Sequence, residues 1–518
     1  MRHKIQINAV LVLLAGIVLF SFSACGDEFF NREAGDRITP DLHYNALEYD
    51  LLVSTVGVMV SLQDFMPKLV ILDGLRSDIM DVTENASLEL RNINEHIYSS
   101  ENSFIDASGL YKVIVNANEV LSYIDTVRAN DVNFDDHVAH YWTGELIAMR
   151  SWAYFTIARL YNQVSYIEDN LTSIPDNLDQ LTLTKGEIID TLINQLLPYI
   201  YDPSKEEKVE LKAPYFVNPK AILGELYLEQ GDFQEAITYL KMACESFLND
   251  LSGYKVDKTY QNEGWANIFF NAESQSIENI SIIPFNRNED QNNPLANWFG
   301  HDYEYLVKPS QILVDAYMNQ IPSAGSGGDQ YRGRGVTFGL DTISKESETV
   351  FETEAYITKY EIDWNEPTSS DIIIQRAADL HLLLAEAYNQ LGDLKSQEYA
   401  TMFLNKGVNG VNPKPAEYTK WRNNAGIRGR VYLKEKTVPR DLFDNPRTLY
   451  IEELLLEERM LELAYEGKRW FDLVRIAERR GNPAFLADIV AEKFKGTPKY
   501  NEVRARLMDP NNWYLPVD

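Results

Sequence analysis

Apolar residues recur at intervals of three and four along several long stretches of the chain, which is the spacing of an amphipathic helix. The clearest examples are residues 110–127 (LYKVIVNANEVLSYIDTV) and residues 137–163. Asp169, Asn170 and Pro175 follow the second stretch and predict a loop there. This pattern predicts a fold that is mainly all-α.

Two later stretches resemble each other. Residues 221–240 (AILGELYLEQGDFQEAITYL) and 380–394 (LHLLLAEAYNQLGDL) each contain a helical pattern that ends at Gly-Asp. Five positions align at a constant offset: Leu223 with Leu384, Glu225 with Glu386, Tyr227 with Tyr388, Gly231 with Gly392, and Asp232 with Asp393. Helix pairs of the tetratricopeptide kind have this form, and neighbouring pairs bury each other's faces. Helices within residues 110–163, 186–246, 373–407 and 446–480 would supply about four such pairs.

Between these helical parts the sequence is irregular. Residues 250–370 are rich in Asn, Gly, Tyr and Trp, with a strand-like run at residues 280–285, and residues 408–445 contain several glycines and basic residues. Long loops in a compact protein usually carry function. We therefore predict a helical scaffold, mainly residues 40–250 and 373–480, with irregular binding excursions at about 250–370 and 408–445.

The N-terminus has the three parts of a secretory signal. Two basic residues are followed by an apolar run at residues 9–20 and then by small residues before Cys25. The run is shorter than the roughly 20 residues of a membrane span. A lone Cys at this place resembles a lipoprotein processing site, so residues 1–24 are predicted to be a signal peptide, with Cys25 lipidated and residues 25–518 mature. The alternative is an ordinary signal with a Cys nearby by chance.

A second apolar stretch, residues 51–72, is interrupted by Gly57, Asp64 and Pro67. It is predicted to form a buried helix and a loop rather than a membrane span, because a span needs an unbroken apolar run.

The overall charge restricts the partners. The chain of 518 residues has a formal net charge of −30, and without residues 1–24 it has 46 basic and 78 acidic residues, or −32. Such a surface repels phosphate backbones and argues against nucleic acid as a ligand. Of the two cysteines, Cys244 would have no disulfide partner if Cys25 is lipidated, and its helical context indicates a buried structural thiol.

The densest charge lies at residues 457–475, EERMLELAYEGKRWFDLVR. Six charged residues follow one another there at intervals of three or four: Arg459, Glu462, Glu466, Arg469, Asp472 and Arg475. Opposite charges at these intervals can pair along a helix, and Gly467 predicts a break between two helices. A pair of carboxylates could suggest a glycosidase. However, the interleaved arginines would lower the carboxylate pKa values, so we expect a structural role.

Other catalytic and metal-binding patterns are weak. His137 and His140 could share a helical face but have no third ligand, so a helix start is the better interpretation. The glycines at residues 325–328 are not followed by Lys and Ser or Thr, and indicate a flexible loop. No nucleophile elbow or dinucleotide fingerprint is present either. We therefore expect neither a metal nor a cofactor, and no enzymatic activity.

One irregular segment has the composition of a binding surface. Five aromatic or imidazole side chains lie close to three asparagines: Trp298, Phe299, His301, Tyr303 and Tyr305, with Asn292, Asn293 and Asn297. Aromatic faces stack on the C–H faces of sugars, and amides bond hydroxyl groups, so this mixture suits a carbohydrate ligand. The alternative is that these rings pack the loop onto the scaffold.

The segment 457–475 resembles the C-terminal signature of the SusD/RagB family of nutrient-binding outer-membrane lipoproteins. Eleven residues match its pattern: Glu458, Arg459, Glu462, Leu463, Glu466, Gly467, Arg469, Trp470, Asp472, Leu473 and Arg475. Three further segments are similar to helices of that family, at residues 110–121, 144–161 and 372–393. With Cys25, the resemblance covers nearly the whole chain.

This resemblance implies a fold with four tetratricopeptide-like pairs and a non-catalytic, surface-exposed lipoprotein of the Gram-negative outer membrane. It implies a partner, a SusC-like TonB-dependent transporter, to which the protein delivers captured oligosaccharide. Asp27 and Glu28 resemble the surface-export signal of such lipoproteins. The ligand would be a glycan, or a peptide as in some members of the family.

The residues expected to contact the ligand come from two regions. Trp298, Tyr303, Tyr305 and Asn293 belong to the aromatic segment, and the residues Tyr98, Asp78 and Arg76 are a further N-terminal contribution. Two other functions stay open at this point. One is a secreted helical glycoside hydrolase that uses the carboxylates of residues 457–466, and the other is a surface scaffold with no small ligand.

Overall fold

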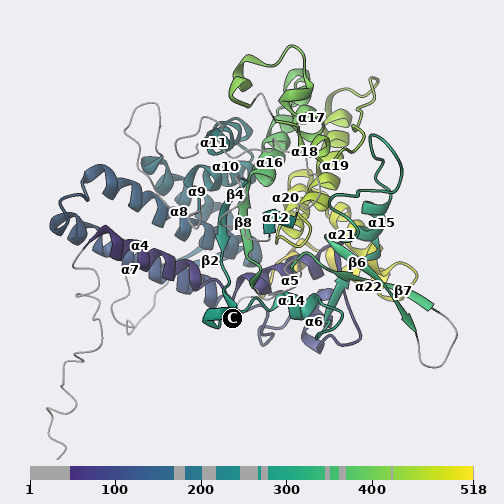
Figure 1. The fold of residues 1–518 in the computed structure, drawn as a ribbon, viewed down its shortest axis with the longest axis horizontal. Coiled ribbons are helices and arrows are strands. Elements are labelled where there is room, and N and C mark those ends of the chain that lie inside the picture. Colours follow the sequence, from purple (N-terminus) through teal and green to yellow (C-terminus); the bar gives the residue numbers. More distant parts are fainter. Residues whose placement is uncertain are drawn as a thin grey trace, which may run out of the picture.

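The computed structural model describes residues 47–167, 181–200, 217–245, 266–269, 278–344, 351–360, 369–421 and 424–516. The predicted signal peptide and Cys25 lie outside these residues. Helices make up most of the described chain (Figure 1), which confirms the prediction of a mainly α-helical fold. In the part of the chain that the structure describes, no helix is both long and apolar enough to cross a membrane.

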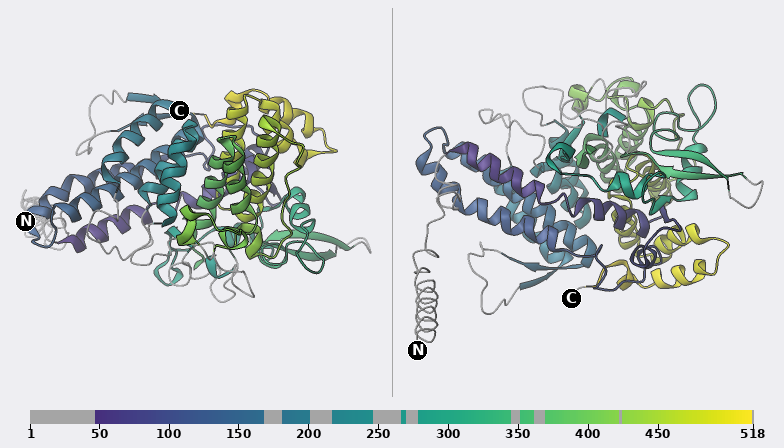
Figure 2. Two further views of the ribbon diagram at one scale, coloured as in Figure 1. Left: turned by 90° about the horizontal axis from the view of Figure 1, so that it is seen from above. Right: turned by 60° about the horizontal axis from the view of Figure 1, so that its bottom comes forward.

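The longest helices form the N-terminal part of the scaffold. Helix α7 (Ser108–Asn130) packs along α8 (Asp136–Tyr161), and α9 (Lys185–Leu196) packs against α8. Helix α8 begins as predicted, because the Asp135 carboxylate accepts hydrogen bonds from the backbone N–H groups of His137 and Val138. Its second half is buried on all sides. These helices form one end of an elongated molecule, as Figures 1 and 2 show.

The two predicted repeat pairs are present. Helices α10 (Pro219–Gln230) and α11 (Phe233–Glu245) form one pair, and α16 (Ala377–Gln390) and α17 (Leu394–Leu404) form the other. Gly231 and Gly392 both have positive φ, of +89° and +79°, which lets the chain turn sharply between the helices of each pair. Helix α11 packs on α16, so the two pairs stack into one core.

Cys244 is buried at this junction, as predicted, with its Sγ atom 3.8 Å from Nδ1 of His381. Burial raises the pKa of the Cys244 thiol well above its usual value. It is therefore a neutral packing residue.

Residues 51–72 contain the predicted helix and loop, and in addition the start of a second helix. They form parts of two helices, α4 (Glu48–Val60) and α5 (Met66–Arg76), joined by the turn at residues 61–65. The predicted loop corresponds to this turn, which contains Asp64, whereas Pro67 lies in the first turn of α5 and does not interrupt a helix. A proline is tolerated there, since the first backbone N–H groups of a helix have no partner within it. Every residue of helix α5 except Lys68 is buried.

The described strands form four two-stranded antiparallel sheets. They pair β1 (Met80–Val82) with β5 (Val307–Pro309), β2 (Gln163–Tyr166) with β3 (Leu181–Thr184), β4 (Asn279–Ile283) with β8 (Ile372–Arg376), and β6 (Phe338–Ser344) with β7 (Phe351–Ile357). Strands β4 and β8 are fully buried, and β8 leads directly into α16. The β6–β7 hairpin extends from the end of the molecule opposite the long helices (Figure 2).

The C-terminal helices complete the scaffold. Helix α19 (Asp444–Glu462) and helix α20 (Arg469–Arg480) are separated by a break that contains Gly467, as predicted, with φ of +71°. Helices α21 (Pro483–Ala491) and α22 (Lys499–Leu507) follow. The remaining described α-helices are α6 (Leu88–Asn94), α12 (Ala266–Phe269), α14 (Leu295–Phe299), α15 (Gln311–Met318) and α18 (Ile427–Arg430).

Candidate functional site

The predicted aromatic segment lies beside residues 83–104, because β5 pairs with β1 and brings the two stretches together. Two hydrogen bonds, one from a backbone N–H and one from a side-chain amide, connect the turn after α14 to that stretch. The Thr83 N–H donates to the Leu306 carbonyl at 3.0 Å, and the Asn85 side-chain amide donates to the Glu304 carbonyl at 3.0 Å. The turn therefore has a fixed position on the scaffold.

Trp298 of α14 contacts Phe104 of the neighbouring stretch. Their rings meet edge to face, with centroids 5.8 Å apart and an interplanar angle of 61°. Both rings are half-buried against the core. Beside Phe104, the Ser103 carbonyl accepts a bond from Lys68, and Ser103 donates to the Glu89 carboxylate. We call Phe104, Trp298, His301 and Tyr303 the aromatic surface.

Tyr303 is the most exposed ring of the predicted set, at 54%. His301 lies in the same turn, and its ring centroid is 5.2 Å from that of Tyr305 and 6.1 Å from that of Tyr356 on β7. Tyr305 itself is buried, and its hydroxyl donates to the Ala355 carbonyl at 3.1 Å. Burial raises the pKa of Tyr305, so this phenol stays neutral and anchors the turn to β7. Phe299, also in the segment, is fully buried.

Asn293 has no exposed surface. Its side-chain amide donates to the Ser370 carbonyl at 2.7 Å, and its oxygen accepts the Leu295 N–H at 3.0 Å. In this structure Asn293 positions the start of α14, and its amide is not available to a ligand.

The three N-terminal residues of the predicted set lie together at the end of α5, but they face the protein. The Arg76 guanidinium is buried 4.4 Å above the Trp470 ring, and its Nε donates to the Tyr98 hydroxyl at 3.0 Å. Asp78 is buried against Arg469. Only Tyr98 is half-buried rather than buried. The sequence cannot show that Arg76 and Asp78 bind other residues of the protein, because their partners, Trp470 and Arg469, lie about 400 residues away.

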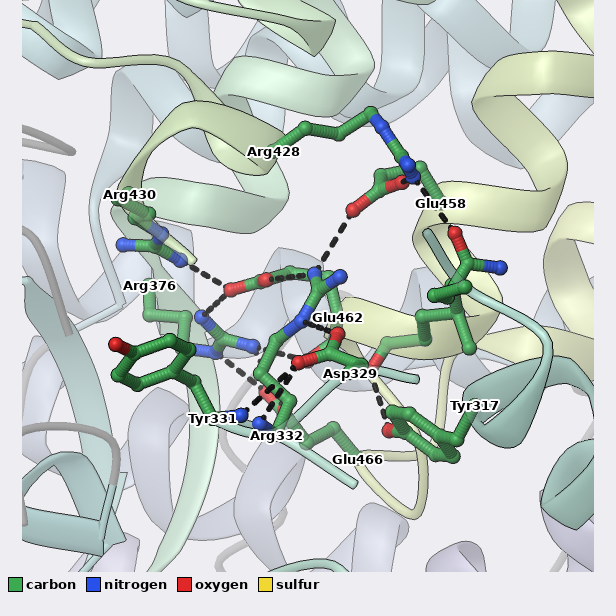
Figure 3. A network of polar contacts seen from close by, with 12 residues as sticks. Tyr317, Asp329, Tyr331, Arg332, Arg376, Arg428, Arg430, Glu458, Glu462 and Glu466 are labelled. Carbon is green, nitrogen blue, oxygen red and sulfur yellow. Dashed lines mark hydrogen bonds and ion pairs between the residues drawn. The ribbon is translucent and has the colours of Figure 1, made fainter. Parts of the chain in front are cut away.

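The C-terminal signature lies in a buried cluster of charges, which we call the central ion network (Figure 3). It contains five acidic and five basic residues: Glu278, Asp329, Glu458, Glu462 and Glu466, with Arg332, Lys359, Arg376, Arg428 and Arg430. Glu462 is central, since it pairs with Arg332 at 2.6 Å, with Arg376 at 2.9 Å and with Arg430. The equal numbers of opposite charges allow this many ions to be buried.

The charges of the signature pair within the segment less often than their spacing predicts. Asp472 does bind two neighbours, Arg459 at 2.7 Å and Arg475 at 2.8 Å. Glu462, Glu466 and Arg469 instead pair with residues from distant segments. Two features explain this. The break at Gly467 divides the segment between two helices, and the charged side chains are buried, so that other chain segments surround them.

The network is unsuited to acid–base catalysis. Burial alone would raise the pKa of Glu462, but Arg430, Arg376 and Arg332 lower it. The pKa values of Glu458 and Glu466 are lowered in the same way by adjacent cations. All three carboxyl groups are therefore ionised at neutral pH, and none can serve as a general acid. This agrees with the structural role expected for the segment.

Two other carboxyl groups do have raised pKa values. Burial raises the pKa of Asp73 to about 7 and that of Glu145 to about 8. Both side chains are buried inside helices of the scaffold, so neither reaches the aromatic surface or solvent. Over the described ranges, no group of three or more His, Cys, Asp or Glu side chains is arranged to hold a metal ion.

The sequence did not reveal Phe104 as a partner of Trp298. The two residues are 194 positions apart, and nothing in the local pattern at residues 99–106 distinguishes a ring that faces Trp298 from one that packs elsewhere. The cations Arg332, Arg428 and Arg430 were also missed as partners of the signature, because they lie in irregular stretches without periodicity.

Comparisons with known proteins agree with this architecture. The model of the SusD family matches residues 251–518. SusD-like protein P2 of Formosa agariphila is 22% identical, with 79% of each chain covered. A SusD-like protein of Bacteroides ovatus is 28% identical over 30% of each chain.

Solved structures share the fold. A SusD superfamily protein from Bacteroides vulgatus superposes with a TM-score of 0.65 at 15% identity, covering 89% of this chain and 92% of that one. A laminarin-binding SusD-like protein has a TM-score of 0.58 at 16% identity, covering 88% of this chain and 95% of its own.

Proposed function

The chain belongs to the SusD family, and we propose that it is a non-catalytic cell-surface protein that binds oligosaccharide at the aromatic surface. The observation that carries the proposal is the exposed Tyr303 ring in the turn after α14, together with the edge-to-face pair of Trp298 and Phe104. A rigid scaffold presents these rings, so little conformational freedom is lost when a ligand stacks on them.

The chemistry of the surroundings suits sugars. Aromatic rings provide apolar faces for the C–H groups of a pyranose, and nearby polar groups can bond its hydroxyls. Glu84, Asn85 and Asp302 are exposed around the turn and supply such groups. The turn is tied to residues 83–85, so these polar groups and Tyr303 move as one unit.

The names of relatives support a carbohydrate ligand. One structural neighbour is described as laminarin-binding, and another, from Bacteroides vulgatus, as a SusD-like carbohydrate-binding protein. Their identities to this chain are 16% and 17%, so the individual ligand does not carry over. Laminarin is nonetheless a suitable first probe.

The proposal includes an anchor and a partner. Residues 1–24 would be removed as a signal peptide, Cys25 would carry the lipid, and residues 25–518 would form the mature protein on the outer membrane. A SusC-like TonB-dependent transporter would receive the ligand. Transfer requires that the ligand binds more tightly to the protein closed over the transporter than to the open one, since only differential affinity shifts such an equilibrium.

Isothermal calorimetry of the purified mature protein tests the ligand class. The panel contains laminarin, other neutral glycans, charged glycans and a set of peptides. Binding to at least one glycan is expected. Binding to peptides alone would replace the carbohydrate proposal with a peptide-binding function. A protein that copurifies with the transporter but binds no glycan or peptide would be a scaffold.

A further inference from the structure

Two tyrosines from distant parts of the chain form a pair of rings outside the aromatic surface. Tyr331 lies in the loop after α15, and Tyr432 lies just after α18. Their ring centroids are 5.5 Å apart, with an interplanar angle of 39°. Tyr331 is half-buried and Tyr432 is 37% exposed. We call these two residues the tyrosine pair. It joins the two irregular stretches, about 250–370 and 408–445, that the sequence predicts to carry binding.

The backbone of Tyr432 has an unfavourable conformation. Its φ is +53°, in the left-handed region that bulky side chains rarely adopt. Strained residues of this kind persist only where the surrounding structure holds them, and they are concentrated at functional sites. Here the Tyr432 carbonyl accepts a hydrogen bond from the Ser323 N–H at 2.7 Å, and the Lys434 N–H donates to the Ile321 carbonyl at 2.8 Å. The two loops therefore hold Tyr432 in this conformation.

The central ion network fixes the backbone next to both rings. Arg332, which follows Tyr331, pairs with Glu462 at 2.6 Å (Figure 3). Arg430, two residues before Tyr432, pairs with the same carboxylate. A ligand that stacks on the tyrosine pair therefore meets a surface that is already ordered, and its binding costs little conformational entropy of the protein.

The exposed charges next to the tyrosine pair are positive. Residues 318–336 and 427–434, which form the two loops, contain five basic residues and one acidic residue, Asp329, which is buried. Three of the five basic residues are buried in the central ion network, and the other two, Arg334 and Lys434, are exposed. Neither pairs with a carboxylate of the residues that the structure describes. The net charge of the chain is −30, so this surface has the opposite sign from the protein as a whole.

The surroundings combine these cations with apolar area. Each tyrosine is followed within three residues by one of the two exposed cations. The next acidic residue along the chain, Glu435, pairs with Lys406, so its charge is compensated. Met318 and Ile321, 43% and 60% exposed, add apolar surface from the first loop. Aromatic rings suit the C–H face of a sugar, and Arg and Lys bind carboxylates through charge-assisted hydrogen bonds.

We propose that the tyrosine pair, together with Arg334 and Lys434, forms a second carbohydrate-binding site that is selective for uronic acids. The pyranose ring stacks on the tyrosines, and its carboxylate pairs with the two cations. The site is separate from the aromatic surface, because α18 lies well apart from α14 in Figure 1. The inference rests on the proposed function for the ligand class, and it adds a preference for charge.

Isothermal calorimetry of the purified mature protein tests this preference. The probes are oligogalacturonate and alginate oligosaccharides, each compared with its methyl ester, which keeps the sugar rings and removes the charge. At least one acidic probe should bind, and its ester should bind about tenfold more weakly or worse, because the charge-assisted bonds are lost. Binding of neither acidic probe, or equal binding of acid and ester, would overturn the inference. Neutral glycans that still bound would then leave the proposed function standing.

The variant Tyr432→Gly locates the site. Glycine adopts a positive φ without strain, which offsets its greater freedom in the unfolded chain, so the melting temperature should stay close to that of wild type. Uronate affinity should fall about tenfold or more, since the stacking ring is gone. Tyr303→Ala should leave uronate affinity unchanged. Unchanged affinity in Tyr432→Gly would overturn the inference. If only Tyr303→Ala lost uronate binding, the ligand would lie on the aromatic surface, which would support the proposed function and remove the second site.

A double variant, Arg334→Gln with Lys434→Gln, tests the cations. Uronate affinity should fall about fivefold or more, and its dependence on NaCl concentration should decrease, because exposed charges are screened by salt. The control is Lys495→Gln with Lys499→Gln, two exposed lysines elsewhere on the surface. An equal loss of affinity in both double variants would show a general effect of net charge and would overturn the role of Arg334 and Lys434. Glutamate-rich peptides that bound as tightly as the uronates would overturn the selectivity for sugars.

Discussion

Asp78 and Arg469 form a two-point ion pair with distances of 2.7 and 2.8 Å, although 391 residues separate them in the sequence. Both side chains are buried. Asp78 lies just after α5, and Arg469 opens α20 within the C-terminal signature. The pair therefore fastens the N-terminal part of the scaffold to the signature, and fork geometry of this kind is specific to arginine.

Replacing Arg469 by Ala should lower the free energy of unfolding by about 3–5 kcal/mol, because it leaves the Asp78 carboxylate buried without its cation. Urea unfolding monitored by tryptophan fluorescence measures the change. Lys495→Ala is the matched control, since Lys495 pairs with Glu492 on the surface and should contribute little. An Arg469→Ala protein with wild-type stability that has lost its ligand would assign Arg469 to binding instead.

Glu462→Gln should destabilise the protein by a similar amount, about 3–5 kcal/mol, since three arginines would then face a neutral group. Glu457→Gln on the same helix is the comparison. Glu457 is half-exposed and pairs with Lys436 at 2.9 Å, so its loss should cost at most about 1 kcal/mol. The same variants test for hydrolysis. If wild type released reducing sugar and a folded Glu462→Gln protein did not, the protein would be an enzyme.

Tyr303→Ala should weaken glycan binding about fivefold or more, equivalent to about 1 kcal/mol, and leave the melting temperature unchanged, because the ring is exposed. Calorimetry with the best ligand of the panel measures the effect. Phe443→Ala provides the control, since Phe443 is 68% exposed next to α19 and lies outside the aromatic surface. Equal affinities for wild type and Tyr303→Ala would remove Tyr303 from the site.

Glu386 should make the protein less stable in acid. Burial would raise its pKa, but Arg475 and Arg479, at 2.8–3.0 Å, lower it from 4.5 to about 2. The lowered pKa contributes stability that is complete above pH 4.5 and is lost as the pH falls toward 2, by about 3 kcal/mol. Unfolding free energies measured over this range should fall less steeply for Glu386→Gln. If the unfolding free energies of wild type and Glu386→Gln changed equally with pH, Glu386 would not be ionised in the folded protein.

Asp73 should have the opposite dependence. Burial raises its pKa from 3.8 to about 7, so the folded protein binds this proton more tightly than the unfolded chain does. The stability that it contributes is complete below pH 3.8 and is lost as the pH rises to 7, by about 4 kcal/mol at most. Asp73→Asn retains an oxygen that can accept the hydrogen bond from the backbone N–H of Trp470, whose nitrogen lies 2.6 Å from the Asp73 carboxylate. Between pH 3.8 and 7, the free energy of unfolding of this variant should rise relative to that of wild type. A difference between the two proteins that does not change with pH would contradict the prediction.

The elements that the sequence predicted well are those defined by neighbouring residues. The pairs α10–α11 and α16–α17 follow from apolar periodicity and from Gly-Asp turns, both of which act within a few residues. Pro67 shows the limit of such signals. A proline indicates a loop or the first turn of a helix equally well, and only the burial of α5 distinguishes the two.

The candidate site could be predicted only in part. Aromatic composition identified the segment of Trp298 and Tyr303, because such residues gathered in an irregular stretch are unusual. It could not separate exposed Tyr303 from buried Tyr305, since the difference arises from the contact with β7. Arg76 and Asp78 were predicted to contact the ligand, and the sequence could not show that both are buried. Their partners, Trp470 and Arg469, come from the other end of the chain.

The central ion network has a consequence for the order in which the chain is made. Arg332, Arg376, Arg428 and Arg430 leave the ribosome before Glu458, Glu462 and Glu466, with which they pair. Until those glutamates emerge, the four guanidinium groups lack much of the compensating charge that their burial requires. Closure of this part of the core therefore requires residues 458–466, and a chain that ends before them is expected to leave these arginines unburied.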